Sequence, residues 1–505
     1  MDPKTFGRRL AQFIVEYGLF IVILVLGLYI WSAVFSAAVT DYLGEELWRS
    51  RNVWLGPGVR PGEFTFEIFG VSYTVLYQFE GYTDYTFYYV HWGHNILNGV
   101  MPYSGEFGYI LLDGVTNNNG AYIFPPLTAI FYGIGIMIPV DNWGIGFLLA
   151  AFGYLTVFPV YGLGRELSNN RQVGEVAALT YLITPNVLYH IGFLWTNPSP
   201  FIFFFFSGFY MLVKGKRHTG TLLIVVAALF KQTAWFLGIP LVVFLLMKPR
   251  PMPEDKDAHP NSEEQPESKE TKNTEDESTS VVDVLNDNLK KLYGYLTTYF
   301  DFKGFLVSVI VVIIFIGAIM YPFIVAQPDF WNFMRLAMGG WRLDSYTEAP
   351  PYGMPIRLQV LPVVYGMPAL AEILDVIVYS GGLLVMGVIV FWGLMVMEPK
   401  YEGKSKVYLR RLLFFAMLMM LWVNLTGPRG VFKYYFVLFA PFFSIFSSAN
   451  MATSTEDRIP FSYSMFWMPL TFSLLILVPV REVYLMYVIL IFVGYLLAKP
   501  IGEFW

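Results

Sequence analysis

Cysteine is absent from this chain of 505 residues, and charged residues make up only 14% of it. The lack of cysteine excludes disulfide bonds, iron–sulfur ligation and thiol catalysis. A soluble protein averages about 25% charged residues, so the shortage of charge excludes an ordinary soluble domain. Hydrophobic residues reach 56% and aromatic residues 18%, and the mean hydropathy is +0.52. The composition therefore predicts a polytopic membrane protein.

The net charge of −5 is concentrated in one segment of the chain. Residues 249–280 hold ten acidic and four basic residues, so the remainder carries about +1. That balance excludes an acidic shell and a nucleic-acid-binding surface. The segment is rich in Glu, Ser, Pro and Lys and has no aromatic residue. We therefore expect a disordered acidic cytoplasmic linker at residues 249–288.

The first apolar run, Phe13–Val39, follows a basic pair, Arg8 and Arg9. The run is too long for the core of a signal peptide and has no convincing cleavage site, so we predict a retained helix with a cytoplasmic N-terminus. A polar interval, residues 41–123, comes next. We expect it to form a long loop on the outer face that carries juxtamembrane helices.

A short apolar segment, residues 124–140, opens with two prolines. The connections after it carry Arg165 and Arg171, and then Lys214 to Arg217. The positive-inside rule places both basic connections in the cytoplasm only if residues 124–140 do not cross the membrane. We therefore predict that this segment is re-entrant or interfacial.

The apolar run Thr219–Met247 would span about 43 Å as one helix, against about 30 Å of hydrocarbon. Lys231 and Gln232 interrupt it near the middle. A single crossing here would also place the later basic loop, Lys400–Arg411, on the outer side. We therefore predict two short helices that form a hairpin, with Lys231 at its outer turn.

The rear of the chain, residues 289–505, is expected to form a second membrane module behind the front module at residues 1–248. An outer loop at residues 327–371 carries several arginines. The chain shows no internal repeat, which weakens a secondary-transporter interpretation. The prediction is an all-α polytopic protein with about twelve transmembrane helices and both termini in the cytoplasm. The remaining expected helices are Trp143–Gly164, Val173–Phe193, Pro198–Val213, Lys303–Val325, Glu372–Met397, Leu409–Leu425, Phe432–Ser448, Phe461–Val478 and Val483–Ala498.

The order of several short motifs is similar to that in a known superfamily. These motifs are Asp84-Tyr85 followed by His91-Trp92, the Phe-Pro-Pro-Leu-Thr-Ala stretch at residues 124–129, the Lys-Gln segment at residues 230–235, and the basic turn at residues 427–433. Together they resemble the GT-C superfamily of polyprenyl-phosphate-sugar-dependent integral membrane glycosyltransferases. The resemblance is to the glucosyltransferases that extend lipid-linked oligosaccharides and to the related mannosyltransferases.

Two features depart from the pattern of that superfamily. The late outer turn lacks the histidines found there, and Arg429 is the nearest substitute. Several branches also place a second acidic residue beside the loop aspartate, whereas Thr83 precedes Asp84 here. These departures leave open the branch of the superfamily and the sugar that is transferred.

The resemblance implies that Asp84 is the general base. Sugar transfer to a hydroxyl needs a base to take the acceptor proton as the anomeric carbon is attacked, and a carboxylate under aromatic walls could do so in an inverting displacement. The alternative is an ordinary loop carboxylate that caps the following helix.

Lys231, Arg429 and Lys433 are the expected ligands of the donor phosphate. A lysine in an apolar segment costs about 2.5–3.5 kcal/mol on insertion scales and needs a partner, which a lipid phosphate would supply. Arg429 could grip phosphate bidentately. The alternatives are snorkelling to interfacial water for Lys231 and interfacial anchoring for the other two residues. Arg335, Arg342 and Arg357 are weaker candidates for the same role.

Aromatic and polar side chains of the outer face are the expected substrate-binding wall, although aromatic residues at helical spacing are more often packing. His91 and His94 could share a metal, but a site needs at least a third ligand, so no metal and no cofactor is expected. The predicted substrate-binding residues are Tyr85, His91, Trp92, Gln232, Trp195 and Asn197.

The resemblance implies a hexosyl- or pentosyltransferase whose donor is a dolichyl- or other polyprenyl-phosphate sugar. Its expected partners are that donor, a lipid-linked glycan or glycolipid acceptor, and membrane lipid, with no nucleic acid. The expected location is the plasma membrane of a prokaryote or otherwise the endoplasmic reticulum, with the active site on the outer or lumenal face. Two alternatives stay open: a flippase or transporter of lipid-linked sugars, and a structural scaffold that uses the acidic linker for docking.

Overall fold

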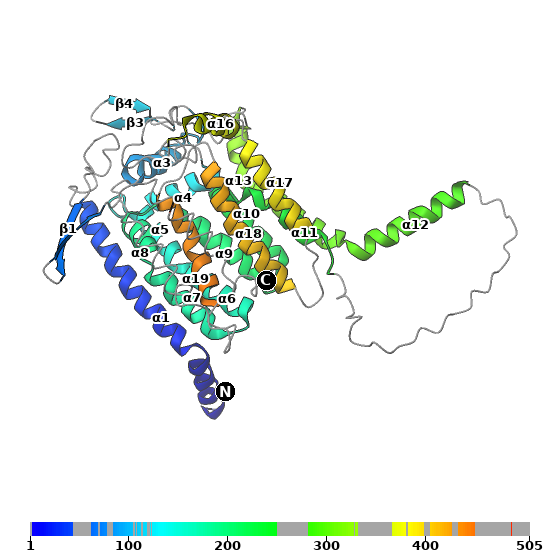
Figure 1. Cartoon of the computed structure of the whole chain (residues 1–505), viewed down its shortest axis with the longest axis horizontal. Coiled ribbons are helices and arrows are strands. Elements are labelled where there is room, and N and C mark those ends of the chain that lie inside the picture. The colour runs from blue at the N-terminus through cyan, green and yellow to red at the C-terminus, as the bar shows by residue number, and fades with distance from the viewer. Residues whose placement is uncertain are drawn as a thin grey trace.

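The protein is mostly helical, and its helices form a bundle (Figure 1). The computed structural model describes residues 3–43, 62–68, 71–77, 84–104, 107, 109–112, 115–118, 122, 124–249, 281–327, 329–331, 366–379, 382–397, 405–426, 433–449 and 486. The expected helices Phe461–Val478 and Val483–Ala498 lie outside the described residues apart from residue 486, as does most of the outer loop at residues 327–371.

The helices of the front half follow one another with short connections. The two η elements of this half that begin at Tyr85 and Leu188 are π-helical, and the one that begins at Gln232 is a 3₁₀ helix. The elements are α1 (Pro3–Leu43), η1 (Tyr85–Tyr89), α3 (Val90–Leu97), α4 (Pro126–Ile136), α5 (Gly144–Leu155), α6 (Val157–Ser168), α7 (Arg171–Ile183), α8 (Pro185–Val187), η3 (Leu188–Phe193), α9 (Pro198–Val213), α10 (Arg217–Phe230), η4 (Gln232–Leu237) and α11 (Gly238–Leu246).

The rear half contributes fewer described elements, and several of its helices, α13 and α17 among them, pack on the front half. Helix α18 packs on α9 and α6, and α19 packs on α7 and α6. The elements are α12 (Val281–Tyr299), α13 (Phe302–Ala326), α16 (Pro368–Tyr379), α17 (Gly382–Met397), α18 (Ser405–Thr426), the 3₁₀ helix η6 (Lys433–Phe439) and α19 (Ala440–Ala449).

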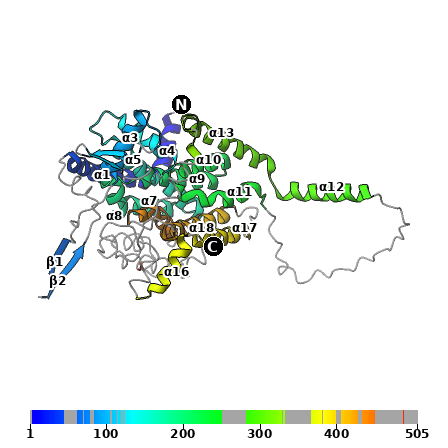
Figure 2. The ribbon, with the colours of Figure 1, turned by 90° about the horizontal axis from the view of Figure 1, so that it is seen from above.

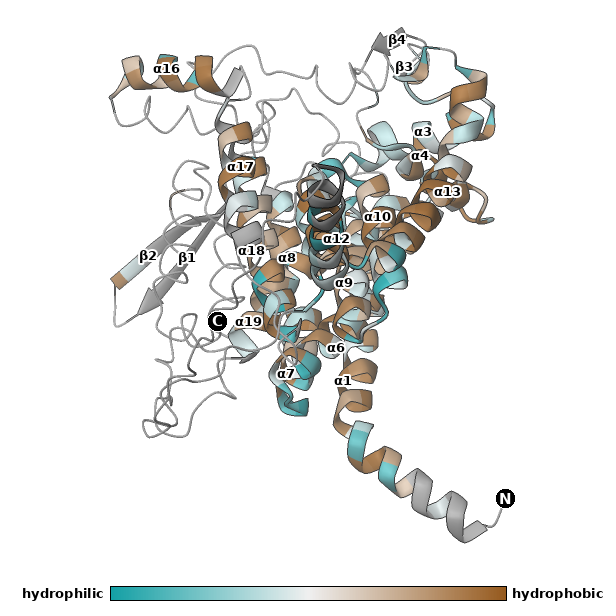
Figure 3. Ribbon diagram, turned by 90° about the vertical axis from the view of Figure 1, so that its right-hand side faces the viewer, coloured by the Kyte–Doolittle hydropathy of each residue, from teal (hydrophilic) through white to brown (hydrophobic). Residues whose placement is uncertain are grey.

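Four helical segments of the described chain are long and apolar enough to cross a membrane. They are Ala11–Thr40, Gly144–Ser168, Phe302–Ala326 and Lys406–Asn424. A fifth crossing is possible if the pair Arg171–Ile183 and Pro185–Phe193, which bends by 46°, counts as one span. The described residues therefore give four or five spans by length and composition. Other helices expected to span, such as α9, are shorter than 18 residues, and two of the twelve expected spans lie outside the described residues apart from residue 486. Figure 3 shows apolar residues along most of α13 and α17.

Several predicted helices correspond to more than one element; the expected helix Trp143–Gly164, for example, is α5 and α6. The expected helix Val173–Phe193 bends at Thr184, whose ψ of 115° is extended because a proline follows it. The expected helix Glu372–Met397 corresponds to two described helices, α16 and α17, and residues 380–381 between them lie outside the described residues.

The expected linker ends earlier than predicted. Helix α12 begins at Val281, so residues 281–288 are helical. The apolar residues Val281, Leu285, Leu289 and Leu292 recur every three or four positions, which favours a helix there. Residues 250–280 lie outside the described residues.

The polar interval between α1 and α4 contains two β-hairpins as well as helices, so the chain is not purely α-helical. Strand β1 (Gly62–Ile68) pairs antiparallel with β2 (Val71–Tyr77), and β3 (Tyr109–Leu112) pairs antiparallel with β4 (Val115–Asn118). The predicted juxtamembrane helices correspond to η1 and α3. Alternation of apolar and polar residues at Phe64, Thr65, Phe66 and Glu67 is the local signal for a strand.

The centre of the bundle is the pair α9 and α10. Helix α9 buries a stripe of phenylalanines, including Phe201, Phe205 and Phe209. Gly208 and Gly220 let the two backbones approach closely, because a Cβ on either glycine would lie 2.8 Å from the carbonyl oxygen of the other. Small residues at such contacts are typical of helix pairs in membranes.

One end of the bundle carries a network of ion pairs. Glu166, in α6, accepts from Lys214 at 3.0 Å and from Lys406 at 3.1 Å, and so ties α18 to the front half. Arg165 pairs with Glu16 of α1 at 2.9 Å. The basic connections that the sequence assigns to the cytoplasm therefore gather where α1 begins.

Candidate active site

Asp84 lies at the opposite end of α1 from this ion-pair network. It precedes η1, and its carbonyl oxygen accepts from the backbone N–H groups of Tyr88 and Tyr89. Within the described part of the chain its carboxylate makes no capping hydrogen bond to η1. Instead the hydroxyl of Tyr89 donates to Oδ2 of Asp84 at 3.4 Å. The half-buried carboxylate therefore faces a tyrosine rather than serving as the helix cap that was the alternative interpretation.

Tyr85 anchors the start of this segment to α5. Its ring is fully buried, and its hydroxyl donates to the carbonyl oxygen of Asn142 at 2.7 Å. The same hydroxyl accepts from the backbone N–H of Gly146 at 2.9 Å, one of the donors in the first turn of α5 that has no partner inside the helix. These two hydrogen bonds to the main chain fix the position of the backbone next to Asp84.

Trp195 completes that anchor. Its indole ring is fully buried, with its centre 4.9 Å from the ring centre of Tyr85. Its backbone adopts a left-handed φ of 51°, which is unusual for a bulky residue. A Cβ on Gly146 would lie 2.5 Å from Cε3 of Trp195, so only glycine fits against the ring.

Helix α4 connects Asp84 with the Lys-Gln segment. Tyr132 of α4 is fully buried, and its ring stacks on that of Tyr89 with the ring centres 4.7 Å apart. Tyr89 is the residue whose hydroxyl donates to Asp84. One turn earlier, the hydroxyl of Thr128 donates to the carbonyl oxygen of Phe230 at 2.7 Å. Four residues of α-helix rise about 6 Å. Helix α4 therefore brings the neighbourhood of Asp84 and the residue before Lys231 to adjacent turns of one helix.

Lys231 occupies the break between α10 and η4. Its φ of −149° and ψ of 128° are extended, so the chain leaves the helix at this residue. Its Nζ lies 4.5 Å from the ring centre of Tyr435 in η6, and the residue is only 8% exposed. An aromatic face stabilises a cation in a desolvated site. The ammonium is thus turned inward against the rear half of the protein.

The two arms on either side of Lys231 return to the same end of the bundle. Arg217, which begins α10, donates from Nη2 to the carbonyl oxygen of Leu245 near the end of α11, at 3.4 Å. Helix α10 has 14 residues and rises about 21 Å, less than the thickness of the hydrocarbon core. Lys231 therefore lies at the turn of a doubled-back segment.

A second aromatic contact joins the front and rear halves beside Lys231. The ring of His190, which is 1% exposed, lies 6.4 Å from that of Tyr434, and Tyr434 lies 4.6 Å from Tyr435. His190 and Lys231 therefore contact consecutive residues of η6. Element η6 supplies one wall of the region around Lys231.

The histidines of α3 occupy different environments. His91 is half-buried, and burial lowers the pKa of its ring, with a further lowering from the nearby His94. Nε2 of His94 lies 3.0 Å from Oδ1 of Asn142. Trp92 is buried, and its ring stacks at 6.3 Å on that of Tyr132. Among the described residues, no group of three or more His, Asp or Glu side chains is arranged to hold a metal.

The remaining predicted site residues are only partly described. Asn197 precedes α9 and is half-buried, and Gln232 begins η4 and is half-buried. Lys433 begins η6, with only its backbone described. Arg429, Arg335, Arg342 and Arg357 lie outside the described residues.

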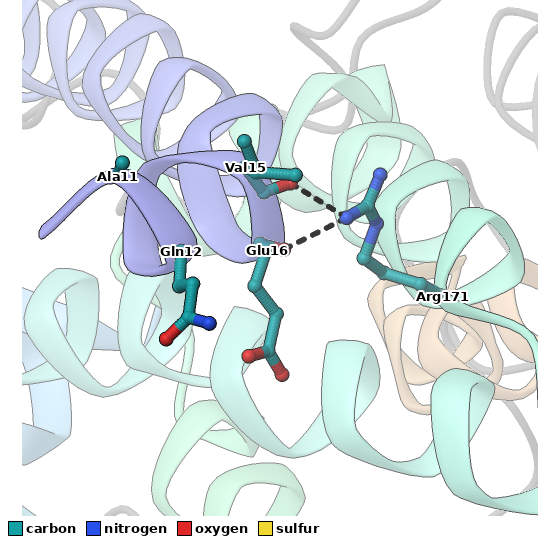
Figure 4. Close-up of a pocket in the computed structure, with 5 residues that line it drawn as sticks. All are labelled: Ala11, Gln12, Val15, Glu16 and Arg171. Atoms are coloured by element: carbon teal, nitrogen blue, oxygen red, sulfur yellow. Dashed lines mark hydrogen bonds between the residues drawn. The ribbon is translucent and has the colours of Figure 1, made fainter. Parts of the chain in front are cut away.

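A cavity of about 560 Å³ lies far from these residues (Figure 4). It is lined by Ala11, Gln12, Val15, Glu16 and Arg171, near the start of α1. The Arg171 guanidinium donates to the carbonyl oxygen of Val15 at 2.7 Å and pairs with Glu175 at 3.1 Å. Tyr42, whose ring lies 5.8 Å from that of Tyr85, is 26 residues further along α1, or about 39 Å. The cavity is therefore at the opposite end of the bundle from Asp84.

One family model matches part of the chain. Residues 124–256 match dolichyl-phosphate-mannose-protein mannosyltransferases. The match covers about a quarter of the chain, from α4 to just beyond α11, and includes Trp195, Asn197, Lys231 and Gln232. A search of curated proteins and a search of solved structures each found no match.

The match supports a GT-C membrane glycosyltransferase, as the motif order predicted. Together with the apolar helices it indicates an integral membrane protein that uses a polyprenyl-phosphate sugar. Asp84 lies upstream of the matched region, so its role depends on the contacts described above.

Sequence reasoning missed Thr128, Tyr132, Tyr89 and His190. Thr128 and Tyr132 are four residues apart and therefore share a face of α4, and this spacing was the available signal for both. The contacts of Tyr89 and His190 join segments that are distant in the chain, and no local pattern indicates them.

Proposed function

We propose that the protein transfers a monosaccharide from a polyprenyl-phosphate donor to an acceptor hydroxyl, with inversion, on the outer face of the membrane. The observation that carries the proposal is the role of α4. On this helix Tyr132 stacks on Tyr89, whose hydroxyl donates to Asp84, and Thr128, one turn away, bonds to the residue before Lys231. A base and a phosphate-binding cation must flank the anomeric carbon in such a transfer. The family match over α4 to α11 supports the same chemistry.

Asp84 is the proposed general base. The acceptor oxygen attacks the anomeric carbon, the bond from that carbon to the phosphate oxygen breaks, and the acceptor proton passes to the carboxylate. The polyprenyl phosphate leaves with the bonding electron pair. The half-buried position of Asp84 leaves part of the carboxylate accessible for an acceptor, and the hydroxyl of Tyr89 orients Oδ2.

Lys231 is the proposed counter-charge for the departing phosphate. A cation that is aimed beforehand at the developing negative charge stabilises the transition state more in a dry site than in water. Lys231 is 8% exposed and its ammonium is held over Tyr435, which supports this role. Arg429 and Lys433 belong to the segment that leads into η6, and we propose that they contribute to the same phosphate site.

The proposed substrate wall has two kinds of residue. His91, Gln232 and Asn197 are half-buried, and we propose that they hydrogen-bond sugar hydroxyls. Tyr85, Trp92 and Trp195 are buried, and the contacts of Tyr85 and Trp195 support a contribution to the wall by positioning Asp84.

Two acceptors are compatible with this geometry. The motif order favours a lipid-linked glycan, whereas the description of the matched family names a protein acceptor and mannose. Purified protein in nanodiscs would be supplied with labelled polyprenyl-phosphate mannose or glucose, and with either a lipid-linked oligosaccharide or a Ser/Thr-rich peptide. Label on the oligosaccharide supports the first acceptor, and label on the peptide supports the second. Movement of the donor across the bilayer without any transfer would identify a flippase and contradict the proposal.

The two proposed roles are separated by comparing binding with a single turnover. Asp84→Asn should lower single-turnover transfer by about 10²–10⁴ with donor affinity little changed, because a general base acts in the transition state. Lys231→Met should weaken donor affinity as well as rate. Asp141→Asn and Lys216→Met are matched controls at exposed positions and should leave both quantities near those of the wild type. Wild-type transfer by Asp84→Asn would show that Asp84 is not the base.

A further inference from the structure

Helix α12 carries an apolar face that the described protein does not cover. Leu289, Leu292 and Leu296 recur at spacings of three and four, so they share one face. Leu289 is 55% exposed and Leu292 is 53% exposed. Figures 1 and 2 show α12 projecting away from the rest of the bundle. A row of leucines exposed to water is unfavourable, so this face should contact another apolar surface or lipid.

The opposite face of α12 is polar. Lys290, Gly294 and Thr298 are spaced four apart and lie about 180° from the leucine row. All three residues are exposed. This separation into an apolar and a polar face is typical of helices that lie in a membrane interface.

The C-terminal end of α12 is fixed to the bundle by main-chain hydrogen bonds. The backbone N–H of Lys248 donates to the carbonyl oxygen of Tyr299 at 2.8 Å, and that of Asp301 donates to Leu246 at 2.7 Å. Asp301 also pairs with Arg217 at 2.7 Å. These contacts attach α12 where α10 begins and α11 ends. Helix α13, which is long and apolar enough to cross a membrane, starts at the same level.

Helix α13 continues the apolar surface into the membrane. It begins at Phe302, three residues after α12 ends, and its 25 residues are sufficient to cross the hydrocarbon core. Only 11% of the residues in its apolar centre are buried against the described protein, which leaves most of its surface available to lipid. Phe302 and Leu306, in its first turns, are 48% and 56% exposed. The exposed apolar surface of α13 thus follows directly after that of α12 in the chain.

The orientation and charge of α12 fit a membrane surface. Figure 1 shows α12 running across the direction of α17 and α18 rather than along it. Lys290 and Lys291 in the C-terminal half of α12 and Lys303 at the start of α13 are exposed, whereas Asp283 and Asp287 lie in the N-terminal half. Lysines at the membrane surface attract anionic headgroups. The lysines lie at the end of α12 that joins the apolar helix α13. This arrangement favours lipid over a second copy of the chain or another protein as the partner of the leucine row.

We propose that α12 lies in the membrane interface, with its leucine row in the acyl region and its lysine face toward water. It would anchor the rear module where the chain re-enters the membrane after the acidic segment. This placement is independent of the proposed transferase activity.

Spin labels on the full chain test the placement directly. The absence of cysteine allows a single label at Leu292→Cys, on the leucine row, or at Gly294→Cys, on the opposite face. A Cβ at Gly294 meets nothing within 4 Å, so this control is compatible with the fold. The protein would be reconstituted in nanodiscs of phosphatidylcholine and phosphatidylglycerol. Collision of each label with oxygen, which concentrates in lipid, would be compared with collision with a water-soluble nickel chelate.

The ratio of oxygen to nickel collisions should be about threefold or more higher at position 292 than at position 294. Leu289→Asp in the Leu292→Cys protein should reduce that ratio, whereas Thr298→Asp, on the polar face, should not. Equal ratios at the two positions would place α12 in water and overturn the proposal. Low collision rates with both reagents at position 292 would show that protein covers the face, which would also overturn it.

Discussion

Tyr85→Phe tests whether the tyrosine beside Asp84 is an anchor of the fold. The substitution keeps the ring and removes the hydroxyl that bonds to Asn142 and Gly146. Gly146 is buried, and an unsatisfied buried N–H group costs about 1–3 kcal/mol. Asn142 is exposed, so water can replace the lost bond there at a cost of about 0.5–1 kcal/mol. The free energy of unfolding should therefore fall by roughly 1.5–4 kcal/mol.

Tyr181→Phe is the matched control for this substitution. The hydroxyl of Tyr181 is also fully buried, but the structure gives it one main-chain bond, to the carbonyl oxygen of Gly153 at 2.8 Å. Its loss should cost about 1 kcal/mol. Equilibrium unfolding by SDS in mixed micelles, followed by tryptophan fluorescence, would measure both changes.

Measurements of stability and of donor affinity decide whether Tyr85 anchors the fold or contacts the substrate. A Tyr85→Phe protein no less stable than Tyr181→Phe would refute the anchoring argument. An anchoring role also requires that turnover fall with donor affinity unchanged, because Asp84 is the adjacent residue. Loss of donor affinity at wild-type stability would instead support direct contact between Tyr85 and the substrate.

The other predictions concern packing, pH and metal. Gly146→Ala should destabilise the protein by about 1–3 kcal/mol in the same unfolding assay, since the new methyl group would overlap the Trp195 ring, whereas Gly294→Ala, where a Cβ meets nothing, should not destabilise it by this mechanism. Because burial lowers the pKa of His91 below its usual 6.5, the unfolded chain binds more protons just below that pH. The unfolding free energy should therefore fall as the pH drops through about 6.5, and His91→Gln should flatten that dependence; an unchanged slope would contradict the cause given. Transfer activity should survive EDTA, and a complete loss restored by Mn²⁺ or Mg²⁺ would show that a metal is required.

Local signals in the sequence predicted much of the helical framework. The helix Pro198–Val213 has the predicted bounds, and α13 differs from its prediction by one residue at each end. The break at Lys231 also agrees with the structure, because a charged residue in an apolar run is visible without tertiary information. The side of the membrane on which Lys231 lies stays a prediction.

Other features depend on contacts that no local pattern encodes. The stacking of Tyr132 on Tyr89, which bonds Asp84, joins two separate segments, and the fit of Trp195 against Gly146 joins two more. The number of membrane spans also depends on packing that the sequence alone does not show. Short apolar helices such as α4 and α11 are supported by neighbours in the bundle and lack the length of an independent span.

A density map of the protein with a non-transferable polyprenyl-phosphate sugar tests the central claim most directly. We expect the donor phosphate within about 3 Å of the Lys231 ammonium, and the anomeric carbon placed so that an acceptor oxygen beside it can reach Asp84 within about 2.6–3.2 Å. A phosphate bound instead near Arg171, or an anomeric carbon out of reach of Asp84, would contradict it.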